Sequence, residues 1–333
     1  MNDVRSLSRR DIAALAALAL IGLAKGARAQ PAGKVWRIGF LHAGVRPADG
    51  AAPAPLRQAL QALGYVEGRN IAFEGRWAEV RFERLPALAA ELVALQVDAI
   101  VTVGGLPARA AKQATAKIPI VVTGAGDVVE SGLVASLARP GGNLTGVNDP
   151  AAVLSAKRLE LLKELVPSIE RVAVLWNAGD QAMTLRYRQI EVAAQLLRVT
   201  IEPLGVREPD DFNAALAAMN RTRPDALMMV TDALTMLNRQ RVLDYAAQHR
   251  IPAMYEFAVV PRSGGLVSYG SDFDQTFRLA ADYVARILKG ARPGDLPVEQ
   301  PNRYFLVINL NTARALGIGV PQAVLLRADE VIE

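Results

Sequence analysis

The sequence of 333 residues contains no cysteine and only two histidines, His42 and His249. The lack of cysteine excludes disulfide scaffolds, cysteine-ligated zinc, iron–sulfur clusters, thiol nucleophiles and the lipid anchor that bacterial lipoproteins carry on a cysteine. Two histidines are also too few for a histidine-rich metal site. We therefore expect neither a metal nor a cofactor, and much enzyme chemistry is excluded.

Several motifs of catalysis and nucleotide binding are missing as well. The sequence has no G-x-x-x-x-G-K-[ST] phosphate loop, no H-E-x-x-H motif and no G-x-S-x-G nucleophile elbow. Gly124-Ala125-Gly126 lacks the third glycine of a dinucleotide-binding fingerprint, because Val129 stands in its place. These absences favour a binding protein over an enzyme.

The overall charge of the chain is concentrated at its N-terminus. The formal net charge is +5, but five of the 38 basic side chains and two of the 33 acidic ones precede residue 30. The rest of the chain is close to neutral, so we expect no nucleic-acid partner. The hydrophobic content of 51% excludes intrinsic disorder and is sufficient for two domains with sizeable cores.

The first thirty residues have the pattern of an export signal. Arg9 and Arg10 precede an uncharged stretch from Ile12 to Ala24, and Ala27-Arg28-Ala29 has the small-residue spacing of a cleavage site. A helix over the uncharged stretch would be about 20 Å long, too short for a hydrocarbon core about 30 Å thick. We therefore expect cleavage after Ala29.

Removal of residues 1–29 leaves a mature chain that we expect in the periplasm, as a monomer without a membrane anchor. The arginine pair resembles a twin-arginine signal. Ile12 stands where that motif usually has phenylalanine, so the ordinary secretion route stays open.

From Val35 onward, short β-branched runs alternate with longer amphipathic stretches, which predicts an α/β fold with parallel sheets covered by helices. A cluster of helix and strand breakers at Arg139–Asn143 separates two stretches with the same order of elements. We predict two similar lobes, each a parallel sheet between helices, joined by a hinge of several strands. The first lobe would comprise residues 34–147 and about 269–291, and the second residues 148–268 and about 292–333.

Polar, glycine and aromatic residues follow the carboxyl ends of the predicted strands, where open parallel sheets bind ligands. The candidate ligand-binding residues of the first lobe are His42, Trp77, Gly104, Gly105, Thr123 and Asp127. Those of the second lobe are Asn177, Asp232 and Tyr255, with Tyr269 at the crossover between the lobes.

Each candidate also has a purely structural interpretation. Gly104-Gly105 could form only a tight turn, or could let an anion approach the start of the following helix. Asp127 could cap the next segment or bind an ammonium group. Asn177 could be a turn residue, His42 a loop residue and Trp77 a packing group. An anion site, a carboxylate and aromatic groups together suit an amino acid.

Several blocks of the sequence match a known family. They are Gly64–Asn70, Arg84–Ala89, Arg139–Val147, Lys157–Pro167, Gly264–Gly270, Asp295–Pro301, Val307–Leu310 and Arg327–Ile332. In these blocks the chain resembles the substrate-binding proteins of ABC importers, in the subfamily that includes proposed binders of tryptophan and related aromatic amino acids. The resemblance implies a type I periplasmic binding-protein fold that closes on a small molecule. It also implies delivery to a membrane permease with its cytoplasmic ATPase, and no enzymatic activity.

The sequence departs from this family close to the candidate site. It reads Asn177-Ala178 and Asp127-Val128 where the family usually has Asn-Pro and Asp-Pro. Two other functions stay open. The chain could be a periplasmic ligand sensor for a membrane receptor, or a two-lobe enzyme such as a glycosyl transferase.

Overall fold

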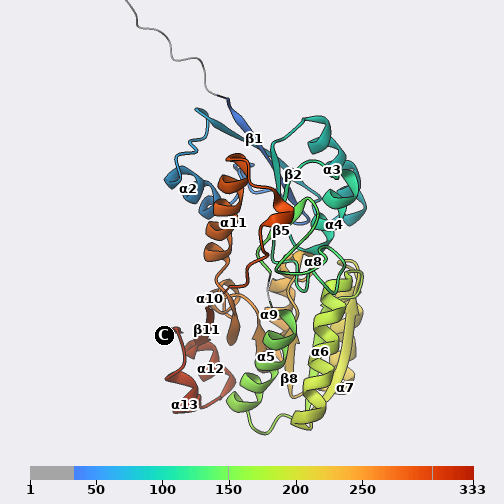
Figure 1. The fold of residues 1–333 in the computed structure, drawn as a ribbon. Helices are drawn as coiled ribbons and strands as arrows, with labels where there is room; N and C mark the ends of the chain where they lie inside the picture. Colours follow the sequence, from blue (N-terminus) through green and yellow to red (C-terminus); the bar gives the residue numbers. More distant parts are fainter. Residues whose placement is uncertain (1–33, 149, 302) are drawn as a thin grey trace, which may run out of the picture. The chain divides into compact units, whose positions relative to one another are not determined.

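A computed structural model of the protein describes residues 34–148, 150–301 and 303–333. The predicted export signal, residues 1–29, lies outside the described residues. The chain from Trp36 to Glu333 forms one compact unit that contains two β-sheets with helices on both faces (Figure 1). The predicted α/β fold class is confirmed.

The first sheet is entirely parallel, with the strand order β2-β1-β3-β4-β5. Side chains alternate between its two faces. In β1, Ile38 and Phe40 join one hydrophobic cluster and Leu41 joins the other. Burial on both faces is typical of a parallel sheet covered by helices. The strands are β1 (Trp36–His42), β2 (Ile71–Trp77), β3 (Ala99–Val103), β4 (Ile120–Thr123) and β5 (Leu144–Gly146).

The second sheet repeats this order as β7-β6-β8-β9-β10, and these strands are parallel. It continues with β11, which is antiparallel to β10, and β12, which is parallel to β11. The sheet is therefore mixed beyond β10, whereas the sequence predicted only parallel strands. The strands are β6 (Arg171–Asn177), β7 (Thr200–Val206), β8 (Ala226–Met229), β9 (Ala253–Tyr255), β10 (Val267–Ser271), β11 (Tyr304–Asn309) and β12 (Glu330–Ile332).

Helices cover both faces of the first sheet, and we call this sheet with its helices the first lobe. One face packs against α3 and α4, and the other against α2 and α11. Two short 3-10 turns, η1 and η2, also belong to this lobe. The elements are α2 (Ala54–Ala62), η1 (Phe82–Arg84), α3 (Leu85–Ala94), α4 (Gly105–Ala114), α11 (Phe273–Leu288) and η2 (Pro293–Asp295).

The second sheet with its helices forms the second lobe. One face packs against α5, α6, α12 and α13, and the other against α7, α8, α9 and α10. These helices are α5 (Ala151–Leu165), α6 (Gln181–Leu197), α7 (Asp211–Thr222), α8 (Ala233–Leu237), α9 (Arg239–Gln248), α10 (Val259–Arg262), α12 (Leu310–Leu316) and α13 (Gln322–Leu325).

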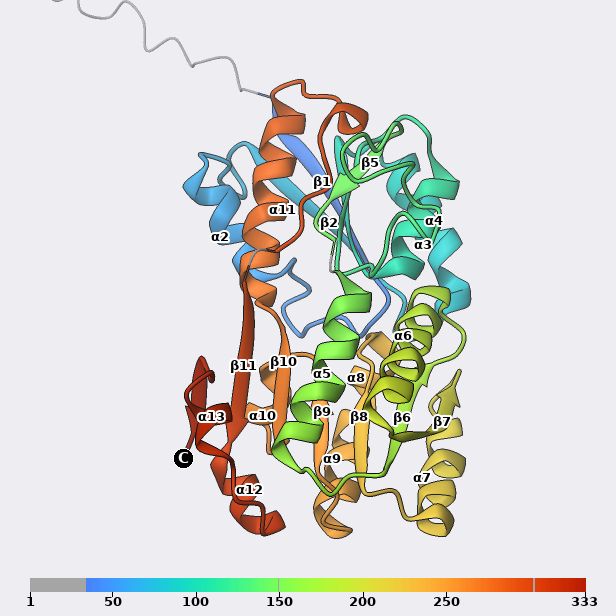
Figure 2. The ribbon, with the colours of Figure 1, turned by 60° about the horizontal axis from the view of Figure 1, so that its bottom comes forward.

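The chain passes between the lobes after β5, after β10 and before β11. Figure 2 shows α11 beside α2 and β1, although β10 directly before it and β11 after it belong to the second sheet. The last two crossings run close to each other, since β10 and β11 pair directly. The lobes are thus joined by several strands, as the sequence predicted.

The crossings lie a few residues later than the sequence suggested. β10 stays in the second sheet through Ser271, because that residue still pairs with β11, so the crossing follows the predicted residue 269. The segment after α11 remains on the first lobe beyond residue 292. Thr145 Oγ1 donates a hydrogen bond to the Leu296 carbonyl at 2.8 Å, and Glu299 N donates to the Gly146 carbonyl at 3.0 Å. The return to the second lobe follows Glu299.

Candidate functional site

A cavity of about 710 Å³ is lined by both lobes, at the carboxyl ends of their parallel strands. His42 ends β1 and Gly104 follows β3 on the side of the first lobe. Thr231 follows β8 and Ser271 ends β10 on the side of the second lobe. Ligands of open parallel sheets bind outside these strand ends, and the volume is in the range of small-molecule sites.

Helices α4 and α6 are two of the helices that begin at the cavity. Gly104 is the N-cap of α4 and has a φ of +90°, a conformation that residues with a Cβ rarely adopt. Asp180 is the N-cap of α6, and its carboxylate accepts a hydrogen bond from Ala182 N at 2.8 Å. The backbone N–H groups and the dipole at such helix starts favour negatively charged groups.

The two lobes contact each other beside the cavity. Arg109 of α4 donates a hydrogen bond to Oε1 of Gln181 in α6 at 3.2 Å. A Cβ added to Gly105 would lie 3.5 Å from the Cβ of Ala182, and one added to Gly126 would lie 3.4 Å from Nε of Arg186. The start of α6 therefore lies in van der Waals contact with the glycine loops of the first lobe, and the lobes are closed on this side.

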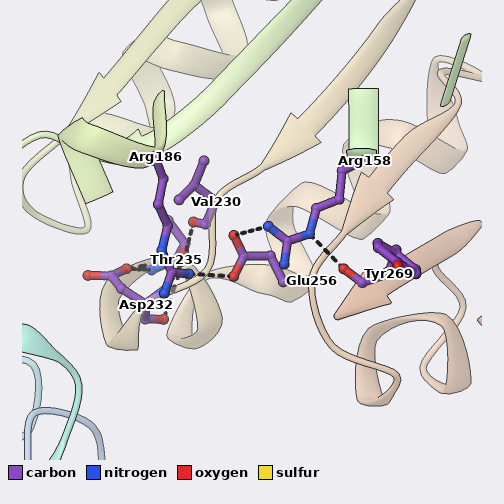
Figure 3. Close-up of polar contacts among 7 residues, drawn as sticks. All are labelled: Arg158, Arg186, Val230, Asp232, Thr235, Glu256 and Tyr269. Carbon is purple, nitrogen blue, oxygen red and sulfur yellow. Dashed lines mark hydrogen bonds and ion pairs between the residues drawn. The ribbon is translucent and has the colours of Figure 1, made fainter. Parts of the chain in front are cut away.

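Arg186 is held at the cavity by a buried charge triad (Figure 3). Its Nη1 donates to Oε2 of Glu256 at 2.7 Å, while Nη1 of Arg158 donates to Oε1 of the same carboxylate at 3.1 Å. Nε of Arg158 donates to the Tyr269 carbonyl at 2.6 Å. The side chains of Arg158, Arg186 and Glu256 are 6%, 4% and 2% exposed. Glu256 thereby fixes Arg186 between the second sheet and the cavity.

Asp232 is a second charged group at the cavity. One carboxylate oxygen accepts from Nδ2 of Asn177 at 2.6 Å and the other from N of Thr235 at 3.0 Å. Burial raises the pKa of the Asp232 carboxyl to about 6, and the negative charge of Asp180 adds to this rise. Burial also raises the pKa of Asp180, against the opposing effects of its hydrogen bond and of Arg186.

His42 lines the cavity as a neutral imidazole. Its Nδ1 accepts a hydrogen bond from Gly44 N at 2.8 Å, so the proton of the neutral ring is on Nε2. Burial lowers the pKa of His42 to about 4. The side chain can therefore offer one N–H donor at neutral pH.

The rest of the lining combines a large apolar surface with a further group of charged residues, namely Arg262, Asp272, Asp274, Asp329 and Glu330. Phe257 and Phe273 pack edge to face with ring centroids 5.2 Å apart. Such a surface suits an aromatic or branched aliphatic group. The larger apolar side chains of the lining include Phe82, Val103, Leu106, Met183, Met236, Phe257, Val259, Phe273, Phe305 and Val307.

Four residues predicted from the sequence line the cavity: His42, Gly104, Gly105 and Asp232. Asn177 does not line the cavity itself, because the residue has no exposed surface. Its side-chain amide donates the 2.6 Å hydrogen bond to the carboxylate of Asp232, which does line the cavity.

The other predicted residues of the first lobe are not part of the lining. Trp77 is 7% exposed and packs in the core beside Phe40. The hydroxyl of Thr123 donates to the Thr102 carbonyl at 3.1 Å. The carboxylate of Asp127 accepts hydrogen bonds from N of Val129 and Glu130 at 3.0 and 2.9 Å, which caps its own turn.

The two predicted tyrosines of the second lobe are also outside the lining. Tyr255 has no exposed surface and belongs to the core cluster on the α7 and α9 face. Tyr269 packs its ring against Tyr304 at a centroid distance of 6.1 Å, while its carbonyl accepts the hydrogen bond from Arg158.

Sequence reasoning did not identify Arg186 and Asp180, and a signal existed for each. Arg186 lies on the buried face of α6, three and four residues after Met183 and Ala182. A charged residue on an apolar helical face indicates a buried polar contact. Asp180 shortly precedes a predicted helix, in the position of an N-cap.

The part of the chain that the structure describes lacks two further features. It contains no group of three or more histidine, cysteine, aspartate or glutamate side chains arranged to hold a metal ion. Among the same residues, no helix has both the length and the apolar character needed to span a bilayer.

Comparison with known proteins adds independent information. The family model described as ABC transporter substrate binding protein matches residues 47–332. A tyrosine-binding protein of Clostridioides difficile (strain R20291) is 29% identical over 259 residues, which cover 78% of this chain and 74% of that protein.

Two solved structures have the same fold. A conserved domain protein from Vibrio cholerae has a TM-score of 0.83 and 29% identity, covering 90% of this chain and 100% of that one. An ABC domain from Streptococcus pneumoniae in complex with L-Trp has a TM-score of 0.82 and 24% identity, with the same coverage. With the family match over nearly the whole described chain, the conclusion is that the protein belongs to the family of ABC transporter substrate-binding proteins.

Proposed function

We propose that the protein is the periplasmic solute-binding component of an ABC importer and that its ligand is an amino acid with an aromatic or branched side chain. A permease with a cytoplasmic ATPase is its partner. The family match, the tyrosine-binding relative and the cavity at the strand ends support this proposal.

The observation that carries the amino-acid proposal is the position of Arg186. A buried guanidinium at the cavity, with the start of α4 on the side of the first lobe, makes a site for a carboxylate. The phenylalanine and methionine side chains of the same cavity provide an apolar surface for the ligand's side chain. An α-amino acid with an apolar side chain is a compact ligand that has both a carboxylate group and an apolar group.

Ligand binding and lobe closure are coupled in this proposal. The carboxylate site consists of Arg186 of the second lobe and Gly104-Gly105 of the first lobe. A ligand can therefore contact both parts of the site only when the lobes are closed. A ligand shifts the equilibrium between open and closed forms by its better contacts with one of them. The closed form then docks on the permease.

Thermal unfolding of the purified protein with a panel of amino acids, short organic acids, sugars and purines tests this proposal. A ligand at about 100 times its Kd adds about 2.7 kcal/mol of stability. That corresponds to a rise in Tm of roughly 5–11 °C. A rise caused by aromatic or branched amino acids is the expected result. A rise caused only by sugars, purines or acids without an amino group would contradict the amino-acid proposal.

A further inference from the structure

Within the part of the chain that the structure describes, the carboxylate of Asp232 has no positively charged partner. Its hydrogen-bond donors are the amide of Asn177 and the backbone N and hydroxyl of Thr235, which are all neutral. Among the described residues, no basic side chain forms an ion pair with it. A partly buried carboxylate without an opposite charge is unfavourable, and a cation placed beside it would relieve that cost.

The hydroxyl group of the neighbouring Thr231 also has no hydrogen-bond partner among the described residues. Thr231 is 7% exposed and lines the cavity, yet its Oγ1 makes no hydrogen bond within the described protein. Buried hydroxyl groups in native proteins are normally hydrogen-bonded, so an unpaired one in a ligand cavity points to a ligand group. Asp180 lines the same cavity, and Asn177 links the two acidic residues: its Nδ2 donates to the Asp232 carboxylate at 2.6 Å, and its backbone carbonyl accepts from N of Asp180 at 3.2 Å.

We propose that Asp232 and Thr231, with Asp180 as a second acidic group, form the subsite for the ammonium group of the ligand. An ammonium group has three N–H donors, and this subsite presents two carboxylates and one hydroxyl as acceptors. The proposal rests on the proposed function, because it adds the positive end of the amino acid to the carboxylate site at Arg186. It assigns to Asp232 the role that the sequence suggested for Asp127.

Calorimetric titration of the full protein with three related compounds tests the subsite. They are L-tyrosine, tyramine, which lacks the carboxylate, and desaminotyrosine, which lacks the ammonium group. The wild type is expected to bind tyrosine most tightly and tyramine more tightly than desaminotyrosine. Asp232→Asn should weaken tyrosine binding by at least about 30-fold, because the ammonium group loses its buried counter-charge. Asparagine is also a good N-cap, so α8 should be retained.

Two further variants make the test specific. Thr231→Val removes only the hydroxyl and should weaken tyrosine binding about tenfold, with desaminotyrosine unaffected. Asp127→Asn is the matched control, because Asp127 also accepts backbone hydrogen bonds but lies outside the cavity lining. Its affinity for tyrosine should stay within about threefold of the wild type.

The pH dependence of tyrosine binding provides a second readout. Titratable and charged groups from both lobes share the cavity with Asp232. Asp180 raises the pKa of Asp232, and Arg186 and Arg109 act on Asp180. The other such residues of the lining are His42, Arg262, Asp272, Asp274, Asp329 and Glu330. Because the pKa of Asp232 is about 6 and that of His42 about 4, affinity should be full only above about pH 7 and decrease as the pH falls through about 6, where the Asp232 carboxylate takes up a proton. The Asp232→Asn variant should lose the part of this decrease that is centred near pH 6, while protonation of Asp180 can still weaken binding at lower pH.

The outcomes separate the subsite from the proposed function. Binding of desaminotyrosine as tightly as tyrosine, or full tyrosine affinity in Asp232→Asn, would overturn the subsite and leave the function intact. Binding of tyramine that depends on Asp232, without binding of any amino acid, would overturn the function and support the subsite. Lack of binding by all three compounds would count against both.

Discussion

Replacement of Glu256 by glutamine is expected to lower the free energy of unfolding by about 3–5 kcal/mol, since it leaves two buried arginines without their shared counter-charge. The Glu256 side chain is 2% exposed and accepts hydrogen bonds from Arg158 and Arg186 at 3.1 and 2.7 Å. Urea unfolding of the variant and the wild type measures the difference.

The matched control is Glu91→Gln, which also removes an ion pair with an arginine. Glu91 accepts a hydrogen bond from Arg76 at 2.6 Å, but its side chain is 53% exposed. An exposed pair contributes about 0–1 kcal/mol, so this variant should be close to the wild type. Equal effects of the two substitutions would show that burial of the triad has no particular importance for stability.

Replacement of Arg186 by methionine is expected to weaken binding of the best amino acid of the panel by at least about 30-fold, or about 2 kcal/mol. The guanidinium lines the cavity and supplies the charge for the ligand's carboxylate. Methionine fills similar space, and Glu256 keeps Arg158 as an ion-pair partner, so the fold should be retained. Calorimetric titration measures the affinity.

Arg76→Met serves as the control for this substitution. Arg76 also pairs with a glutamate but lies outside the cavity lining, so its replacement should change the affinity by less than about threefold. If Arg186→Met binds the amino acid as tightly as the wild type, the carboxylate site lies elsewhere.

The fold could be predicted from local patterns because the parallel strands are strongly apolar. β6 has Val172 and Val174 on one face and Ala173 and Leu175 on the other, which makes it easy to recognise. The crossing positions were less accurate, since they depend on long-range pairing. β10 pairs with β11 over more than thirty residues of intervening chain, and no local pattern reports such pairing.

The candidate site could be predicted in part, for a related reason. The position of strand ends led to His42, Gly104, Gly105 and Asp232, which line the cavity in the structure; their contact with a ligand stays a prediction. The position of a residue at a strand end does not indicate whether its side chain points into the cavity or back into the protein. Thr123 follows the same rule, yet its hydroxyl turns back to a neighbouring strand.

The buried charge triad of Arg158, Arg186 and Glu256 could not be predicted from local sequence patterns. Glu256 is separated from Arg158 by 98 residues and from Arg186 by 70, so only the folded chain brings the charges together. The sequence does contain one usable sign, because Arg158 and Arg186 interrupt the apolar faces of amphipathic helices. Such residues merit attention wherever a helix packs beside a ligand cavity.

A crystal structure of the protein, grown with the amino acid that raises its Tm most, tests the central claim most directly. We expect this ligand in the cavity between the lobes, with its carboxylate at Arg186 and Gly104-Gly105 and its ammonium group at Asp232. Contacts with both lobes should accompany the closed arrangement. A ligand bound outside this cavity, or one in the cavity without contact to Arg186 and Asp232, would contradict the account.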